Sequence, residues 1–377
     1  MITLRVVADS VLEQSPRGIA RYTEELTRAL VETAPRDCEV AAVVSGISGE
    51  EEQSLRERIP GLSSVTRLPL GRRELRTAWQ HGLTTRPLGG MVHAPSLLAP
   101  LVRHDRRRSP GEQTVVTIHD ASAWLHPEDD AQSAWIRGMA KRARKHADAV
   151  VVPTHAVADA LSQHLDLGDR IRVIGGAVSS SLALPADPEG VADRLGLPAD
   201  YVLAVGTLAP RKGLDHLMRA AASAAFPDLP LLIVGPEAWH EQTMSQAVFQ
   251  SGAPEGRIRL LGTMPDDDLA VVIDRATAVA VPSLHEGFGL PAIEALHFGT
   301  PLIHSDAPAL SEVVAGAGVE VPLERASDYA ERLALAIADT VGDSELLRRL
   351  SIQGRDRAQA FSWRDSAERT WQLHAEL

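Results

Sequence analysis

Two carboxylates flank a glycine-rich loop in the segment SLHEGFGLPAIEALHFGTP, residues 283–301. Glu286 stands just before the loop, and Glu294 lies eight residues later, on the helix that the pattern predicts after it. Gly287 and Gly289 allow the backbone to pass close to a ligand and to expose its N–H groups. Where such a loop opens a helix, amide donors and the positive end of the helix dipole converge, so the segment predicts an anion site.

The two glutamates indicate what that anion carries at its ends. A carboxylate accepts hydrogen bonds from two hydroxyl groups, which suits a vicinal diol. One glutamate at a sugar, one at a ribose and the loop amides on a diphosphate between them together describe a nucleotide-sugar site. The alternative is that Glu286 is a surface carboxylate and Glu294 a partner of the helix dipole. The glycines and the apolar strand that precedes them favour the site.

A second strand, glycine loop and helix occur in VGTLAPRKGLDHLMRA, residues 205–220. Gly206 ends the expected strand, and Arg211 and Lys212 stand just before a helix of about 3.6-residue period. An arginine binds phosphate oxygens through two N–H groups, whereas a lysine acts as a point charge. Two cations beside a diphosphate lower the free energy of that group as it leaves. An exposed basic turn is the alternative interpretation.

Two segments of the N-terminal half are weaker candidates. Gly18 ends the loop VLEQSPRG, which follows the strand LRVVADS, and there it would let the backbone face the donor or would simply open a helix. His119 and Asp120 end the strand TVVTIHD, at the edge where parallel sheets bind ligands. We expect His119 to contact the transferred sugar. A buried histidine bonded to a main-chain group is the alternative, and Asp120 is the less favoured of the two.

Three consecutive aspartates, at positions 266–268, resemble a metal-binding group at first sight. They follow Pro265 and precede an apolar helix, so helix capping and compensation of the helix dipole explain them better. We therefore expect no metal.

The elements that must position these residues follow one pattern twice. Short apolar runs bounded by turns predict buried parallel strands at 4–8, 39–45, 114–119 and 149–153, and again at 201–206, 230–235, 258–262, 278–282 and 301–305. Amphipathic helices are predicted between them, for example at 20–33 and 134–147. Two successive β-α-β runs indicate two doubly wound α/β domains. The stretch 179–200, rich in Pro, Ala, Asp and Gly, is interpreted as the linker.

Composition excludes several classes of protein. The chain has 377 residues, which suggests two domains, and one cysteine, Cys38, which allows no internal disulfide and suits a reducing compartment. The first ten residues predict a strand rather than a signal peptide, and no apolar run approaches the length of a spanning helix. The net charge of −12 makes nucleic acid a poor partner. These features favour a cytoplasmic location, which includes the inner face of the membrane.

The negative charge is confined to one half. Residues 171–377 carry 16 Lys and Arg against 28 Asp and Glu, whereas residues 1–170 carry 22 of each. The first half also holds three basic clusters: Arg72, Arg73 and Arg76; Arg103, Arg106, Arg107 and Arg108; and Lys141, Arg142, Arg144 and Lys145. A solvated surface is the simpler interpretation of these clusters. Peripheral contact with anionic lipid headgroups or with a phosphorylated acceptor is the other.

Taken together, these motifs resemble the retaining glycosyltransferases of group 1, which have the GT-B fold and an E-x7-E motif. The resemblance rests on VGTLAPRKGLDHL, LLIVGP, LLGTMPDDDLAVVI and PSLHEGFGLPAIEALHFGTPLI in the second half, and on GIARYTEEL, TVVTIHD and VVPTHAVADAL in the first. The ending FSWRDSAERTWQLHAEL is similar to the family's C-terminal helix. HAPSLLAP with TIHD is similar to the mannosyltransferase branch.

The resemblance implies two Rossmann-like domains facing across a cleft. Residues 1–180 would form the acceptor-side domain and 181–361 the donor-binding domain, with a helix over about 362–377 crossing back to the first. Many members have two adjacent glycines in the first loop, where this chain has Gly18 alone. That departure places the phosphate contact from the first domain in question.

The resemblance also implies a role for each matching residue. Glu286 would contact donor-sugar hydroxyls and Glu294 the ribose. Arg211 and Lys212 would hold the diphosphate with the backbone of Phe288, Gly289 and Leu290, while His119 would contact the transferred sugar and Arg259 and Leu260 would border the base. Transfer would retain the anomeric configuration without cofactor or metal. A GDP-sugar, GDP-mannose above all, is the favoured donor over a UDP-sugar, and the acceptor would be a glycan, a lipid-linked sugar or a small molecule.

Two other classes of function remain open at this stage. A sugar-nucleotide epimerase or a phosphorylase would use the same fold, but a phosphorylase needs a cofactor-bearing lysine, and besides Lys212 the chain has only Lys141 and Lys145. A non-catalytic nucleotide-sugar sensor is the other alternative. It would have no need of the full set Arg211, Lys212, Glu286 and Glu294.

Overall fold

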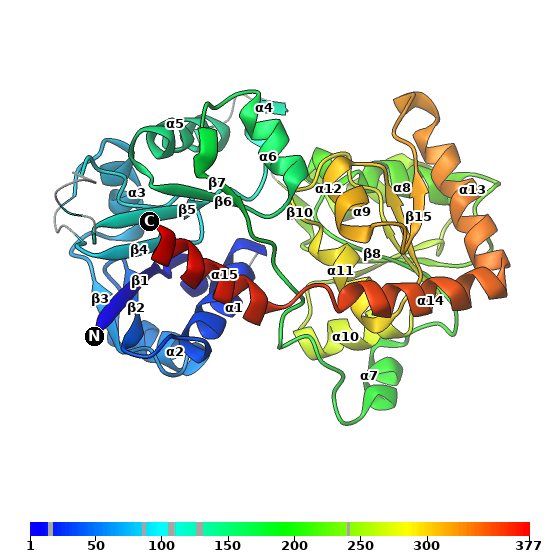
Figure 1. Cartoon of the computed structure of the whole chain (residues 1–377). Helices are drawn as coiled ribbons and strands as arrows, with labels where there is room; N and C mark the ends of the chain where they lie inside the picture. Colours follow the sequence, from blue (N-terminus) through cyan, green and yellow to red (C-terminus); the bar gives the residue numbers. More distant parts are fainter. Residues whose placement is uncertain (14–17, 85–87, 105–108, 110, 126–130, 240–241) are drawn as a thin grey trace. The chain divides into compact units, whose positions relative to one another are not determined.

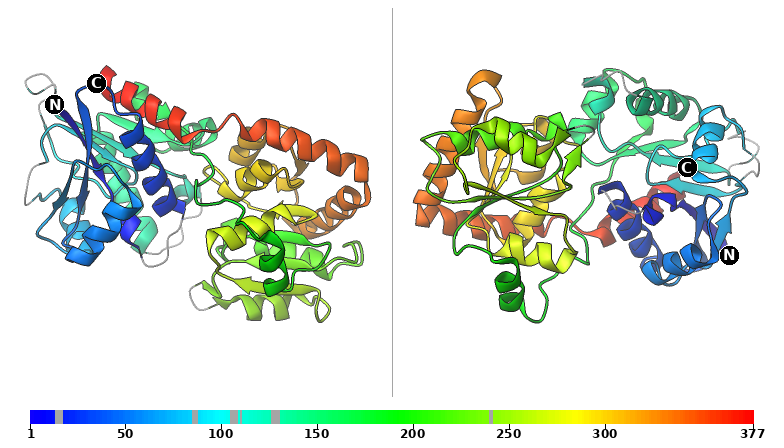
Figure 2. Two further views of the ribbon diagram at one scale, coloured as in Figure 1. Left: turned by 90° about the horizontal axis from the view of Figure 1, so that it is seen from below. Right: turned by 180° about the vertical axis from the view of Figure 1, so that it is seen from behind.

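The computed structural model describes residues 1–13, 18–84, 88–104, 109, 111–125, 131–239 and 242–377 (Figure 1). The chain forms two compact units, one of residues 1–179 together with 362–377, and one of residues 180–361. Each unit is built on a parallel sheet flanked by helices, as the views in Figure 2 show. The expectation of two doubly wound α/β units is therefore confirmed. Within the described residues, no helix is both long enough and apolar enough to cross a membrane.

The sheet of the first unit has seven parallel strands in the order β3-β2-β1-β4-β5-β6-β7. Their bounds are β1 Ile2–Val7, β2 Cys38–Val44, β3 Ser64–Arg67, β4 Met91–Ala94, β5 Gln113–Thr117, β6 Ala149–Val152 and β7 Ile171–Val173. Successive residues of a strand enter different cores, because side chains alternate between the two faces of a sheet. Leu4 and Val6 thus join one core, and Val7 joins the other. A sheet covered on both faces explains why its strands are apolar throughout.

The helices of this unit form two layers. They are α1 Gly18–Glu32, α2 Gly49–Arg58, α3 Arg72–Gln80, α4 Ser122–Leu125, α5 Ala131–His146, α6 His155–Ser162 and α15 Trp363–Glu376, with short 3-10 turns η1 Asp9–Leu12 and η2 Gly168–Arg170. Helices α1, α2 and α15 supply Leu26, Leu55 and Trp371 to one core. Helices α3, α5 and α6 supply Leu75, Met139 and Leu161, among others, to the opposite core.

The sheet of the second unit has six parallel strands in the order β12-β9-β8-β13-β14-β15, and a two-stranded hairpin, β10-β11, lies apart. The bounds are β8 Val202–Val205, β9 Leu231–Val234, β10 Ala238–Trp239, β11 Gln242–Thr243, β12 Ile258–Gly262, β13 Ala278–Val281, β14 Leu302–Ser305 and β15 Val319–Val321. The chain builds outward from β8 on one side and from β13 on the other. The switch in direction therefore falls between these two central strands.

The helices of the second unit are α7 Pro188–Leu195, α8 Leu214–Ala222, α9 Met244–Ser251, α10 Asp266–Asp274, α11 Leu290–Phe298, α12 Pro308–Val314, α13 Tyr329–Gly342 and α14 Ser344–Ala358, with 3-10 turns η3 Pro210–Lys212 and η4 Ala326–Asp328. Leu217, Ala247 and Leu333 join one core from α8, α9 and α13. Helix α11 packs against β13 and β14, and α10, α12 and α14 pack against α11.

The C-terminal helix α15 returns to the first unit, as expected, and packs along α1 (Figure 1). The indole N–H of Trp371 donates to the carbonyl of Leu30 on α1 (3.1 Å), and the hydroxyl of Ser366 donates to the carbonyl of Gly175 (2.8 Å). Residues 362–377 are therefore part of the first unit rather than a tail, and Ala367 and Trp371 join its core.

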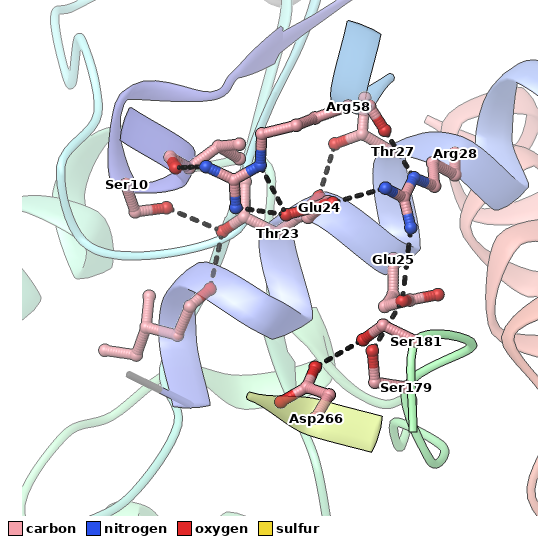
Figure 3. A network of polar contacts seen from close by, with 12 residues as sticks. Ser10, Thr23, Glu24, Glu25, Thr27, Arg28, Arg58, Ser179, Ser181 and Asp266 are labelled. Carbon is pink, nitrogen blue, oxygen red and sulfur yellow. Dashed lines mark hydrogen bonds and ion pairs between the residues drawn. The ribbon is translucent and has the colours of Figure 1, made fainter. Parts of the chain in front are cut away.

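The chain is anchored on both sides of its first passage between units (Figure 3). Ser179 donates a hydrogen bond to Glu25 of α1 (2.7 Å), within the first unit. Two residues later, Ser181 donates to Asp266 at the start of α10, within the second. Nearby on α1, Glu24 accepts from Arg28 and Arg58, which ties α1 to the end of α2.

The linker expectation for residues 179–200 is partly wrong, because the segment contains helix α7. The Asp187 side chain caps the helix by accepting from the amide of Gly190 (2.9 Å), Pro188 starts it, and Gly196 ends it with a φ of 57°. These are the sequence signals of a short helix. Its composition, rich in Pro, Ala and Asp, concealed them.

Candidate functional site

The loops after β8 and β13 lie side by side because these strands are neighbours in the sheet. They leave the carboxyl ends of two parallel strands at the point where the chain's direction of winding reverses. In open α/β sheets this is where ligands bind. Arg211 and Lys212 lie on the first loop and Glu286 on the second. Topology thus brings Glu286 to Lys212, which is 74 positions away in sequence, and to the adjacent Arg211.

Main-chain contacts join the two loops directly. The amides of Leu284 and His285 both donate to the carbonyl of Arg211, at 2.8 and 3.3 Å. Gly213 has a φ of +63°, and a Cβ added there would lie 2.2 Å from the carbonyl oxygen of Pro282. A glycine is required at this position by both its backbone angle and its neighbour. The two loops therefore behave as one body that carries both the cations and the carboxylate.

Within that body Glu286 is the centre of a polar cluster. Its Oε1 accepts from the ammonium of Lys212 at 2.5 Å and from the hydroxyl of Ser283 at 2.8 Å. Its Oε2 lies 3.8 Å from Nη1 of Arg211, beyond hydrogen-bond distance. The side chain of Glu286 is 6% exposed, and that of Lys212 is 19% exposed. Glu286 is thus a buried, paired carboxylate and not the surface carboxylate of the alternative interpretation.

The charges around Glu286 outweigh the effect of its burial. Burial by itself would raise the pKa of this carboxyl, but the positive charges of Lys212 and Arg211, with the hydrogen bonds from Lys212 and Ser283, lower it below its ordinary value. The carboxylate is therefore ionised throughout the neutral range. An ionised carboxylate accepts hydrogen bonds only, so any hydroxyl that approaches it must donate.

Helix α11 follows the Glu286 loop and presents its N-terminus there. Gly289 precedes the helix with a φ of +84°, where a Cβ would lie 2.4 Å from a methyl carbon of Leu310. The helix's own hydrogen bonds begin with the amide of Ala292, which leaves the amides of Gly289 and Leu290 before the ladder. Glu294 is buried on α11, 4% exposed. The loop residue Phe288 packs its ring edge-on against Phe361, with centroids 5.6 Å apart.

In the first unit, His119 lies two residues beyond the end of β5. Its Nε2 lies 2.7 Å from the carbonyl of Pro95, which follows the neighbouring strand β4, and its ring packs edge-on against Tyr22 at 4.8 Å between centroids. Because a carbonyl can only accept, Nε2 carries the proton and Nδ1 is the acceptor nitrogen. Burial lowers the pKa of His119, against smaller opposing effects of Pro95 and Asp120, so the ring is neutral at pH 7.

The other two residues expected to act in this unit are Asp120 and Gly18. Asp120 accepts hydrogen bonds from the amide of Ser122 (2.9 Å) and from its hydroxyl, at the start of α4. Gly18 is the first residue of α1. The loop before it, residues 14–17, falls outside the described residues, so its expected contact with a donor stays a prediction.

Three further expected positions lie elsewhere in the second unit. Gly206 directly follows β8, and its carbonyl oxygen would lie 1.9 Å from a Cβ added to Gly235, so it is the lack of a side chain at Gly235 that allows this close approach after β8 and β9. Arg259 donates to the carbonyls of Gly196 (2.5 Å) and Leu195, at the end of α7. Leu260, beside it on β12, packs partly buried against the core of this unit.

The three aspartates, 266–268, occupy the first turn of α10, after Pro265 as N-cap. Asp268 forms an ion pair with Arg194 of α7 at 2.6 Å, and Asp266 accepts from Ser181. Their place in the first turn fits compensation of the helix dipole, while the capping expected of them is wrong because the N-cap is Pro265.

Sequence reasoning missed the residues that hold the Glu286 loop from behind. The phenol of Tyr329 on α13 donates to the carbonyl of Pro282 (3.2 Å), and the hydroxyl of Ser305 on β14 donates to the carbonyl of Ser283. All three side chains, Ser283 included, are buried. Only the Ser-x-x-Glu spacing within the loop could have signalled Ser283; Ser305 and Tyr329 carry no local signal.

Two α/β units with parallel sheets, and a C-terminal helix that returns from the second unit to the first, are the architecture of the GT-B class of glycosyltransferases. Family comparisons agree. Residues 194–357 match the model of "Glycosyl transferases group 1", and residues 16–182 match that of "Glycosyltransferase Family 4". The chain belongs to this family of retaining glycosyltransferases, which use nucleotide-sugar donors.

Curated relatives of several specificities are similar to this chain. O-antigen chain mannosyltransferase B of Escherichia coli is 29% identical over 69% of this chain and 69% of its own length. D-inositol 3-phosphate glycosyltransferase of Nocardia farcinica is 32% identical over 70% of this chain and 60% of its own length. Alpha-maltose-1-phosphate synthase of Mycolicibacterium smegmatis is 29% identical over 76% of this chain and 79% of its own.

Solved structures share the fold over the whole chain. Sucrose-phosphate synthase from Thermosynechococcus elongatus has a TM-score of 0.75 at 23% identity, with 100% of this chain and 99% of that chain covered. The Anabaena protein HepE in complex with UDP-glucose has a TM-score of 0.73 at 19% identity, with both chains fully covered. At these identities the likeness supports the GT-B fold alone.

Proposed function

We propose that this protein transfers a hexose from a nucleotide-sugar donor bound at the loops after β8 and β13 to a hydroxyl group of an acceptor. The observation that carries the proposal is the cluster of Arg211 and Lys212 around the buried carboxylate of Glu286 at the switch point, beside the N-terminus of α11. Arg211, Lys212 and the first amides of α11 would bind the diphosphate. Glu286 would accept from hydroxyls of the sugar, and Glu294 from those of the ribose.

In the proposed reaction the bond between the anomeric carbon and the diphosphate oxygen breaks as the acceptor oxygen attacks the same face. Attack on the face from which the diphosphate leaves retains the configuration, and the departing diphosphate takes the proton of the acceptor hydroxyl, so charge balances. Negative charge grows on the diphosphate as it leaves. Lys212 and Arg211, held in place before the reaction, would stabilise that charge without reorganisation, which is the main source of electrostatic catalysis.

His119 is proposed to contact the transferred sugar through Nδ1. The neutral ring offers a lone pair at that nitrogen, because Nε2 already donates to Pro95. A neutral acceptor suits a sugar hydroxyl and adds no positive charge beside a developing oxocarbenium ion. This role requires no change in protonation during turnover.

The favoured donor is GDP-mannose. Its support lies in relatives named as mannosyltransferases, O-antigen chain mannosyltransferase B and MMP alpha-(1->4)-mannosyltransferase, the latter 27% identical over 75% of this chain. The HepE structures hold UDP or UDP-glucose, so a UDP-sugar is the competing donor. The acceptor is proposed to be a glycan, a lipid-linked sugar or a small molecule, with polysaccharide biosynthesis as the favoured setting.

We also propose that the first unit contacts a membrane surface from the cytoplasmic side through its basic helices. Helix α5 carries five Lys and Arg and no acidic residue, and α3 on the same face carries three Arg and one Glu. On the opposite face, α2 carries four Glu and two Arg. Lys141, Arg144 and Lys145 are exposed at i, i+3 and i+4 on α5, so they share one side of that helix.

The first test is a thermal-shift screen of the full chain against UDP, GDP, ADP, TDP and their common sugar conjugates. A ligand that binds only the native state stabilises that state by mass action and so raises Tm. At a ligand concentration of a hundred times Kd, the free energy of unfolding increases by about 2.7 kcal/mol. We expect one nucleotide family to raise Tm and its sugar conjugate to be consumed when acceptors are added. A folded protein that neither shifts with any nucleotide nor consumes any donor would contradict the proposal.

The same assays separate the alternatives. An epimerase converts the donor's sugar without an acceptor, and a phosphorylase consumes inorganic phosphate. A sensor binds the nucleotide sugar and leaves it intact. Mass spectrometry identifies the products, and NMR gives their anomeric configuration. Together the two measurements distinguish transfer with retention from each of these outcomes.

A further inference from the structure

Ser283 is a buried polar residue of the loop after β13, and the proposed transfer assigns it no part. It is 2% exposed and lies two residues after the end of β13. Its hydroxyl donates to Oε1 of Glu286 at 2.8 Å. That same oxygen also accepts from Lys212. Glu286 therefore has two donors on one oxygen, both from the protein.

The main chain around Ser283 is held from two sides. Its carbonyl accepts from the hydroxyl of Ser305, and the carbonyl of Pro282 accepts from the phenol of Tyr329. Gly213 also packs against this main chain, because the carbonyl oxygen of Pro282 occupies the space that a Cβ at position 213 would need. With its backbone fixed in this way, the Ser283 hydroxyl has a defined position relative to Glu286.

These contacts divide the two oxygens of Glu286. Oε1 accepts from Ser283 and Lys212, whereas Oε2 lies 3.8 Å from Nη1 of Arg211. We propose that Ser283 is a positioning residue, which fixes the rotation of the Glu286 carboxylate so that Oε2 is presented to a hydroxyl of the donor sugar. The inference rests on the proposed role of Glu286 and adds the residue that makes its orientation specific.

Hydrogen bonds to the carboxylate also favour its ionised form. Ser283 is among the groups that lower the pKa of Glu286, after the larger effects of burial, which raises it, and of Lys212 and Arg211, which lower it. Removing the hydroxyl should therefore move the acid limb of the kcat/KM profile to higher pH. A serine that only filled space would not move that limb.

The test compares Ser283→Ala, Ser283→Thr and a matched control, Ser223→Ala, in the full chain with the nucleotide sugar that wild type accepts. Ser223 also donates to a glutamate, Glu331, at 2.8 Å, but on the exposed surface of α8's C-terminal end. A hydrogen bond to a charged group suggests a loss of about 10- to 100-fold in kcat/KM for Ser283→Ala. Ser283→Thr keeps the hydroxyl and should recover most of the loss, and Ser223→Ala should leave kcat/KM unchanged.

Binding of the nucleoside diphosphate alone provides a second readout. Because Oε2 would face the sugar, Ser283→Ala should lower the affinity for the nucleotide sugar and leave the affinity for the nucleoside diphosphate unchanged. Wild-type kcat/KM in Ser283→Ala, or an equal loss in Ser283→Thr with a parallel fall in Tm, would overturn the positioning role and leave the proposed transfer intact. A wild-type protein that binds no nucleotide sugar would instead overturn the proposed function, and this inference with it.

Discussion

The ammonium nitrogen of Lys212 lies 2.5 Å from Oε1 of Glu286, although 74 residues separate them in sequence. Both side chains are largely buried, so each charge depends on the other for compensation. Breaking a buried pair by removing one partner is more costly than removing both. The pair therefore links the stability of the donor loops to their chemistry, and the two effects can be separated by mutation.

Single and double variants of this pair should differ in stability but not in activity. Lys212→Ala and Glu286→Ala should each lower kcat by about 100-fold or more, since each removes a group proposed to act on the donor. Each should also lower the free energy of unfolding, by up to about 3 kcal/mol, because a buried charge loses its partner. The double variant Lys212→Met with Glu286→Gln should regain much of that stability and none of the activity. Denaturant unfolding and donor turnover measure the two quantities; wild-type turnover in a single variant would remove that residue from the site.

Gly213 should be intolerant of a side chain for two separable reasons. Gly213→Ala places a Cβ at a φ of +63° and 2.2 Å from the Pro282 carbonyl oxygen. Gly252→Ala is the matched control, because Gly252 has a φ of +74° with no atom within 4 Å. The control should cost about 1 kcal/mol for its backbone angle alone. Gly213→Ala should cost more and weaken donor binding, as measured by unfolding and by titration calorimetry. Equal costs would mean that the loops can separate freely.

His119 should contribute without titrating near neutral pH. Burial lowers its pKa, so the kcat/KM profile should lack a limb near pH 6.5 that depends on this residue. His119→Phe should lower kcat/KM by about 10-fold or more by removing one hydrogen-bond acceptor, with little change in the shape of the profile. A limb near pH 6.5 that disappears in the variant would show that the charged ring is required.

The contact of α15 with the first sheet should weaken in acid. Nδ1 of His374 lies 3.0 Å from the side-chain oxygen of Gln113, and its Nε2 lies 3.3 Å from Nδ1 of His93. Burial lowers the pKa of His374 to about 4, and burial together with His374 lowers that of His93 as well. Between pH 6.5 and about 4 the unfolded state therefore binds more protons at these histidines than the native state does. The free energy of unfolding is accordingly highest above pH 6.5 and decreases toward pH 4, by about 3 kcal/mol for His374.

Thermal unfolding between pH 7.5 and 4.5 checks this linkage. His374→Leu should lower Tm at pH 7.5 because Gln113 loses its partner, yet its Tm should fall less steeply with pH than that of wild type. His81→Leu, at an exposed position on the end of α3, should keep the wild-type slope. Identical slopes in all three proteins would show that the buried histidines do not control acid stability.

The basic face of α5 should mediate adsorption to anionic bilayers. Arg144→Glu with Lys145→Glu should weaken binding to phosphatidylglycerol vesicles about 30-fold or more, since each basic residue contributes about 1 kcal/mol near such a surface. Arg348→Glu with Arg349→Glu is the matched control, an exposed adjacent pair on α14 in the second unit. Cosedimentation in 0.1 M salt, with phosphatidylcholine vesicles as the neutral comparison, measures the difference. A wild-type protein that does not bind phosphatidylglycerol vesicles would contradict the proposed contact. Equal losses of binding in the two variants would also contradict it.

Much of the architecture could be read from the chain because buried parallel strands are apolar throughout. The runs at 39–45 and 278–282 became β2 and β13 to within a residue or two. Strand β4 was missed because His93 interrupts its short apolar run, although this histidine packs inside the fold through a contact with α15. Helix α7 was missed for the opposite reason, since a composition typical of loops concealed its capping residues.

The sequence by itself determined the local units of the proposed donor site: a strand, a glycine loop and a helix, twice, with the cations on one and the two glutamates on the other. Only the tertiary structure decided that β8 and β13 are neighbours, which places Lys212 on Glu286 and Ser283 behind it. Local units follow from periodicity and turn chemistry, which act over a few residues. Strand order and buried hydrogen bonds depend on residues far apart in the chain, such as Tyr329 and Pro282, whose contact exists only once the sheet has closed around them.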